Sequence, residues 1–145
     1  MGRNMEPAFD FLNYQIAELS YCFDNSDRDL KKEHSIESEI RLERGNEDPS
    51  AFRITMIIRV LGNPNIRLTI YGYFKWRGEY IEKTTELSLN IYGTSILYPY
   101  ARAAISTISV LDGKPAIMLP TINAFDIFQP KDKGDKIQTA IDDKT

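Results

Sequence analysis

The sequence is short of the residue types that carry most of the chemistry in proteins. It contains one cysteine, Cys22, and one histidine, His34. A single cysteine cannot form an internal disulfide, and these two residues cannot supply the several ligands of a structural zinc site. Gly72 and Gly78 are too far apart for a phosphate-binding loop, which needs a G-x-G core. The sequence therefore predicts no metal site and no cofactor.

A nucleophilic or acid–base site is equally hard to assemble from these residues. The apolar neighbourhood of Cys22 is typical of a packed thiol, and the position of His34 is typical of a strand edge or a loop flank. The carboxylate pairs Glu47-Asp48 and Asp142-Asp143 lie in polar segments, where they are expected to be exposed charge. We predict that the protein is not an enzyme. The alternative is an enzyme that uses His34 to act on a small molecule.

Long apolar runs and an excess of one charge are also missing. No run approaches the roughly 20 apolar residues that cross a bilayer, and the N-terminus lacks the apolar segment of a secretory signal. The 18 basic and 21 acidic residues give a net charge of −3, which offers no electrostatic reason to bind nucleic acid. With 145 residues, 42% of them apolar, the chain is expected to form one cytoplasmic globular domain without membrane insertion.

Alternating apolar and polar residues predict an antiparallel sheet. Residues 34–43, 52–60 and 66–76 follow a period of two, which is typical of half-buried strands. Glycine, asparagine and proline in residues 61–65 favour a tight reversal, so the two flanking strands should form a hairpin. Residues 9–23 are apolar but change phase, which predicts a strand with bulges or a bend.

From residue 95 onward the apolar period changes to about 3.6, the period of an α-helix. Thr94 or Ser95 is the expected N-cap, and Gly113 is the expected C-terminal stop. Pro99 then falls near the first turn, where proline is tolerated. Residues 79–92 are ambiguous, because their leucines and isoleucine fit both a strand and a helix.

One apolar helix stripe and one apolar sheet face need each other for burial. The predicted fold class is therefore α+β, with a four-stranded antiparallel sheet and a long helix packed on one face in the order β-β-β-β-α. Residues 1–130 are expected to form the single domain. Residues 131–145 combine four lysines with four aspartates and few apolar residues, which predicts a flexible polar tail.

Aromatic residues gather in the last predicted strand. Tyr71 and Tyr73 lie on the strand face opposite Phe74 and Trp76, so both faces of this strand carry rings. The outward rings could be buried in a subunit contact, line a groove for an unfolded peptide, or be scattered exposed side chains. The sequence leaves these three interpretations open.

Two motifs follow one another in the C-terminal half. Residues 96–102 read I-L-Y-P-Y-A-R, and residues 114–126 read K-P-A-I-M-L-P-T-I-N-A-F-D after a glycine. Together they resemble the signature of SecB-type chaperones, in which such a helix start leads to a Gly turn, a proline-containing crossover and an N-F-D-like segment. The positions that carry this resemblance are Leu97, Tyr98, Pro99, Tyr100, Ala101, Arg102 and Gly113.

The resemblance implies an ATP-independent holdase that binds unfolded or nascent polypeptides through hydrophobic grooves, with protein export as one setting. It also implies a homotetramer built as a dimer of dimers, a helical arm at residues 79–92 and a crossover at residues 114–125. The candidate peptide-binding residues are the apolar side chains of the crossover and of the aromatic strand, namely Tyr71, Tyr73, Phe74, Trp76, Ile117, Leu119, Ile122 and Phe125. Alternatively, Ile117, Leu119 and Phe125 only cap the helix–sheet core.

One feature departs from the export chaperone. SecB-type proteins dock on the SecA motor through an acidic sheet face and the C-terminal region, whereas the outward strand positions here mix glutamates with arginines and a lysine. This mixture argues against docking on a SecA-type motor. A dedicated SecB-like adaptor for one partner such as an antitoxin, or an oligomeric interaction protein without general chaperone activity, fits the same residues.

Overall fold

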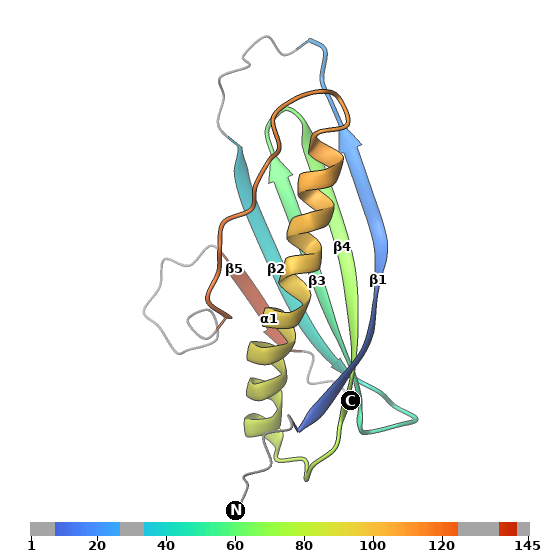
Figure 1. The fold of residues 1–145 in the computed structure, drawn as a ribbon. Helices are drawn as coiled ribbons and strands as arrows, with labels where there is room; N and C mark the ends of the chain where they lie inside the picture. Colours follow the sequence, from blue (N-terminus) through green and yellow to red (C-terminus); the bar gives the residue numbers. More distant parts are fainter. Residues whose placement is uncertain (1–7, 27–33, 125–136, 142–145) are drawn as a thin grey trace, which may run out of the picture.

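The structure, a computed structural model, describes residues 8–26, 34–124 and 137–141 (Figure 1). Its elements are β1 (Phe9–Cys22), β2 (Ser35–Arg44), β3 (Ala51–Leu61), β4 (Asn65–Trp76), α1 (Glu82–Ser109) and β5 (Ile137–Ile141). The strands form one sheet in the order β1-β4-β3-β2-β5. All neighbours are antiparallel except β2 and β5, and α1 lies across one face of the sheet (Figure 1). The predicted fold, a four-stranded antiparallel sheet with one long helix, is confirmed.

The core lies between α1 and the facing side of the sheet. Alternation of period two sends every second strand residue toward the helix, where burial removes its apolar surface from water. The side chains without exposed surface include Ile54, Ile58, Leu68, Ile70 and Phe74 from the strands and Leu89, Leu97 and Ile105 from α1.

The predicted hairpin between β3 and β4 is confirmed. Gly62 has φ of +141°, a conformation that side chains rarely adopt, and its N–H donates to Asn65 Oδ1 at 2.9 Å. Glycine and asparagine therefore supply what this reversal requires.

The phase slip in the first strand corresponds to two β-bulges. The register of β1 against β4 shifts between Phe11 and Asn13 and again between Ile16 and Glu18. Because each extra residue reverses the alternation, Tyr14 and Ile16 lie on the same face as Phe11. An apolar row therefore follows β1 on the helix side.

The N-cap expected at Thr94 or Ser95 is wrong, because α1 begins at Glu82. At this start the N–H of Ile81 donates to the side-chain oxygen of Thr85 at 2.9 Å. Glu82 also places a negative charge in the first turn, where the helix dipole favours it. The N-cap position is therefore Ile81, thirteen residues before Thr94.

Pro99 lies in the interior of α1 rather than near its first turn. Proline removes one helical hydrogen bond, but Leu97, Ala101 and Ile105 on either side of it have no exposed surface. Their burial in the core offsets the lost bond. Residues 79–92, which the sequence left ambiguous, are helical from Glu82 onward.

A fifth strand occupies part of the segment in which the sequence predicts a flexible tail. Ile137–Ile141 pairs in parallel with β2 from Ser38 to Leu42. Without β5, β2 would be an edge strand whose backbone N–H and C=O groups are available for pairing. The apolar pattern of a five-residue segment does not predict such pairing. The remaining residues of 131–145 lie outside the described part of the chain, and the division into a domain and a tail stays a prediction.

Candidate functional site

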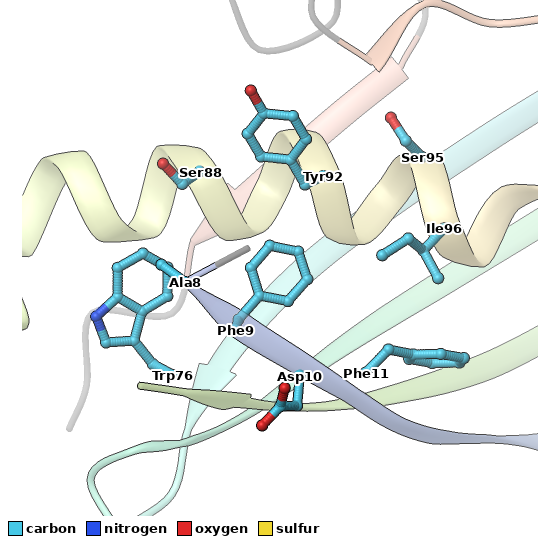
Figure 2. A pocket seen from close by; sticks show the side chains of 9 residues that line it. All are labelled: Ala8, Phe9, Asp10, Phe11, Trp76, Ser88, Tyr92, Ser95 and Ile96. Atoms are coloured by element: carbon cyan, nitrogen blue, oxygen red, sulfur yellow. The ribbon is translucent and has the colours of Figure 1, made fainter. Parts of the chain in front are cut away.

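A pocket of about 690 Å³ lies between β1 and α1 (Figure 2). Figure 2 shows Phe9, Trp76 and Ile96 in the space between the two elements. The rings of Phe9 and Trp76 are stacked, with centroids 6.5 Å apart and planes 13° from parallel. Asp10 points away from the helix in this view, and its carboxylate pairs with Arg77 at 3.3 Å. The pocket therefore offers mainly apolar and aromatic surface.

A second pocket, of about 400 Å³, lies farther along the same two elements. Between the two pockets, Tyr100 stacks on Tyr14 at 4.3 Å and on Phe11 at 6.1 Å, measured between ring centroids. Phe11 also lines the first pocket, so this stack joins the two. We call the two pockets and the stack the β1–α1 groove. It is lined by Phe9, Phe11, Tyr14, Ile16, Leu19, Trp76, Tyr92, Ile96, Tyr100, Ala104, Ile108 and Leu111, together with small and polar residues.

The groove is open because β1 is an edge strand that α1 covers only in part. Tyr14, Ile16 and Leu19 are 41%, 42% and 37% exposed, which is unusual for large apolar side chains on a strand. The only charged residues of β1 are Asp10 and Glu18, and both form ion pairs with arginines at the sheet. Contiguous apolar surface of this kind marks an interaction site.

The crossover runs back beside α1 without regular secondary structure (Figure 1). Two signature residues hold it: Tyr98 donates its hydroxyl proton to the carbonyl of Pro120 at 2.5 Å, and Arg102 Nε donates to the carbonyl of Leu119 at 3.1 Å. Leu119 is 1% exposed and Met118 is 61% exposed. The crossover thus anchors one side chain in the core and presents the next one to solvent.

A pocket of about 590 Å³ lies beside the start of the crossover. Its walls include Phe23, which directly follows β1, Ile36 from β2 and Ile117 from the crossover. His34 lies just before β2 on this wall, and its Nε2 atom is buried with no hydrogen-bond partner in the structure. Lys114 places its ammonium 3.3 Å from the Phe23 ring centroid. The crossover is therefore not sealed beneath its own subunit.

The candidate peptide-binding residues do not gather in one place. Trp76 lines the β1–α1 groove, Ile117 lines the pocket at the start of the crossover, and Ile122 lines a smaller pocket of about 170 Å³. Phe74 and Leu119 are 0% and 1% exposed. Because both side chains are packed into the core, neither presents surface to a bound peptide in this structure.

The two outward tyrosines lie on the face of the sheet away from α1. Tyr71 and Tyr73 are half-buried and meet edge to face, with centroids 6.4 Å apart. The guanidinium of Arg53 lies 4.5 Å from the Tyr71 ring centroid. These rings are therefore separated from the groove by the thickness of the sheet. Phe125, the remaining candidate, lies outside the described residues.

Charges on this outer face are largely paired with their opposites. The guanidinium of Arg53 donates to both carboxylate oxygens of Glu43 at 2.9 Å, which raises the pKa of Arg53. Further pairs join Arg41 to Glu39, Arg67 to Glu18 at 2.9 Å and Lys75 to Asp48 at 3.9 Å. The outer face is therefore mixed and locally neutral, as the sequence indicated.

Most residues that line the groove were not predicted from the sequence. Ser88, Tyr92, Ser95 and Ile96 line it from a single stripe of α1, with spacings of four, seven and eight residues. Reading residues 79–92 as helix would have placed Tyr92 on this stripe. The exposure of β1 left no sequence signal, because it depends on where α1 crosses the sheet.

Among the described residues, no three His, Cys, Asp or Glu side chains form a group that could hold a metal ion. The packed thiol predicted at Cys22 is wrong, since Cys22 is exposed at the end of β1. Burial raises the pKa of Tyr98, which keeps its hydroxyl protonated as a donor to the crossover. Across the described residues, no helix has the length and apolar character needed to span a membrane.

Comparison with known sequences finds two relatives at similar distance. The chain is 28% identical over 127 residues to an uncharacterized protein of Methanocaldococcus jannaschii, covering 80% of this chain and 79% of that one. It is 27% identical over 123 residues to the protein-export protein SecB of Dichelobacter nodosus, covering 85% and 73%. No protein-family model matches the chain.

Comparison with solved structures finds the same architecture. A SecB-like chaperone of Mycobacterium tuberculosis, solved in complex with a ChAD peptide from the HigA1 antitoxin, superposes with a TM-score of 0.64 at 15% identity, covering 79% of this chain and 91% of that one. A protein of unknown function from Streptococcus agalactiae superposes with a TM-score of 0.50 at 11% identity, covering 78% and 97%. The fold is therefore shared with proteins of very different sequence.

Proposed function

We propose that this chain, a member of the SecB-like family, is a chaperone that holds unfolded or nascent polypeptides without using ATP. The observation that carries the proposal is the β1–α1 groove, which is open, apolar and rich in aromatic rings. Apolar burial is non-directional, so such a groove accepts many sequences. Release then follows mass action as the client folds or is taken up elsewhere.

The two halves of the groove are large enough to take client side chains. Their volumes of about 690 and 400 Å³ lie within the range of roughly 300–1,000 Å³ that is typical of ligand pockets. An extended polypeptide along β1 would place its apolar side chains in one half, pass Tyr100 and place others in the second half. The proposed client is therefore an extended, apolar segment.

Of the residues that the sequence suggested, we keep Trp76, Ile117 and Ile122 as proposed client contacts, since each lines a pocket. For Tyr71 and Tyr73 we propose a subunit contact through the outer face. We also propose that the chain forms a homo-oligomer, with a dimer of dimers as the expected state. Measurement of the mass in solution tests this assembly.

The client-binding proposal is tested by suppression of aggregation. The purified protein should keep a chemically unfolded client in solution at stoichiometric amounts. Trp76 is the only tryptophan of the chain and lines the groove, so its fluorescence should change when a client peptide binds. Aggregation at an unchanged rate, with unchanged Trp76 emission, would sink the proposal.

A matched pair of variants on α1 separates groove binding from general surface effects. Tyr92 is 53% exposed and lines the groove, whereas Leu87 is 43% exposed on the same helix and lines none of the pockets described. Tyr92→Asp should weaken client binding because it puts a charge into the apolar surface. Leu87→Asp should leave binding unchanged. Equal losses in both variants would remove the groove from the proposal.

The second candidate is a dedicated adaptor for one partner such as an antitoxin. It is favoured by the antitoxin peptide held by the M. tuberculosis SecB-like chaperone and by the neutral outer face, which lacks the acidic patch of a motor-docking chaperone. Competition between several unrelated unfolded peptides distinguishes the two. A general holdase binds all of them, and an adaptor binds one.

A further inference from the structure

Three side chains on one side of α1 hold the backbone of the crossover. Besides the bonds from Tyr98 to Pro120 and from Arg102 to Leu119, the side-chain oxygen of Ser109 accepts the N–H of Ile117 at 2.8 Å. The Ser109 hydroxyl in turn donates to the carbonyl of Ser106 at 2.9 Å. The residue numbers of these contacts increase from 98 to 109 along α1 and decrease from 120 to 117 along the crossover. The crossover is therefore tied, antiparallel to the helix, at three points between residues 117 and 120.

These bonds go to backbone atoms rather than to the side chains of the crossover. Pro115 and Pro120 lack the amide proton, so this segment cannot form a regular hydrogen-bond ladder. Side chains of α1 replace part of that ladder. As a result, Leu119 points into the core while Met118 remains exposed.

The tied segment also separates two hollows. The pocket of about 590 Å³ is lined by Ile117 and Met118, and the pocket of about 170 Å³ is lined by Ile122 together with Tyr98 and Arg102. Both pockets therefore share walls with residues in or next to the tied segment. A shift of the crossover toward either side would change both volumes.

We propose that Tyr98, Arg102 and Ser109 are positioning residues for client binding, which hold the crossover extended against α1 and keep the hollows on its two sides open. This inference rests on the proposed function. Without these bonds the crossover would populate many conformations, and a client would have to restrict them when it binds. The variants should therefore lose affinity for clients while the helix–sheet core stays folded.

The test measures client affinity and stability in the same set of variants. The probe is a fluorescently labelled, reduced and carboxymethylated protein, which stays unfolded without denaturant. Tyr98→Phe combined with Ser109→Ala removes a donor and an acceptor with little change in volume, and should raise the Kd by about tenfold. Ser109→Thr keeps the hydroxyl, so in the Tyr98→Phe background it should restore part of the affinity.

Ser106→Ala is the matched control on the same helix. The Ser106 hydroxyl donates to the sulfur of Met118, at 3.4 Å, so among the described residues its hydrogen bond goes to a side chain of the crossover and not to its backbone. Its loss should leave the Kd unchanged. Hydrogen exchange at the Ile117 amide provides a direct readout, which should speed up in Ser109→Ala and not in Ser106→Ala.

Each outcome decides one question. Weaker binding with an unchanged melting temperature and faster Ile117 exchange supports the inference. An unchanged Kd, a loss that only follows reduced stability, or an equal loss in Ser106→Ala overturns it while the holdase proposal stands. Failure of the wild-type chain to bind the probe would instead refute the proposed function.

Discussion

Among the described glycines, Gly93 of α1 leaves the least space for a Cβ atom. We therefore expect Gly93→Ala to destabilise the protein. A Cβ atom at this position would lie 2.2 Å from Ile54 Cδ1 and 3.3 Å from the Phe74 ring. Both neighbours have no exposed surface, so neither can swing into solvent. Alanine gains about 1 kcal/mol over glycine in a helix interior, whereas overpacking a tight core costs about 1–3 kcal/mol. At this separation we expect the upper part of that range and a net loss of about 1–2 kcal/mol.

Urea unfolding followed by circular dichroism measures this loss, at a fixed protein concentration because an oligomer would couple stability to concentration. Ile54→Val tests the cause, since it removes the atom that the new Cβ would meet. Alone it should cost about 0.5–1.5 kcal/mol. In the Gly93→Ala background it should stabilise the protein.

Two results would refute this reasoning. The first is a Gly93→Ala protein that is more stable than the wild type, which would mean that helix propensity outweighs the contact. The second is an equal cost of Ile54→Val in both backgrounds. Equal costs would show that the two positions do not interact.

Three other perturbations have defined outcomes. The hydrogen bond from Tyr21 to Asp112 raises the pKa of Tyr21 to about 12, so its stabilisation is complete below about pH 10 and is lost as the pH rises toward 12. Thermal unfolding should show the wild type losing stability relative to Tyr21→Phe between about pH 10 and about pH 12, and parallel pH profiles would contradict this. Tyr100→Ala removes a ring stack worth about 0.5–1.5 kcal/mol and should alter client affinity more than urea stability; the reverse order would argue against a groove role. Gly113 has φ of +75° and nothing within 4 Å of a new Cβ, so Gly113→Ala should cost about 1–2 kcal/mol in urea unfolding and Gly113→Asn less, whereas equal costs would exclude backbone strain as the cause.

The first four strands were predictable because alternate residues of each point toward the helix–sheet core. Alternation of period two records that orientation directly, and even the phase slip near Tyr14 and Ile16 marked real bulges. The first half of α1 was not predictable in the same way. Its buried side includes Thr85, Asn90 and Thr94, whose polar side chains conceal the apolar stripe of a helix.

The groove was only partly predictable for a related reason. Trp76 was singled out by its aromatic neighbours, and it does line a pocket. Phe74, two residues earlier on the same strand face, is fully buried because α1 covers that part of the sheet. Strand alternation assigns a face to a residue, but the crossing point of the helix decides which residues of that face stay open.

The interleaved charges of the outer face have a kinetic consequence. Because Arg53, Arg67 and Lys75 each face a carboxylate, this side of the protein produces little net field beyond about one Debye length. A charged partner would then approach this face by diffusion without long-range steering by it. The rate at which a charged partner docks on the outer face should accordingly be nearly the same in dilute buffer and at high ionic strength.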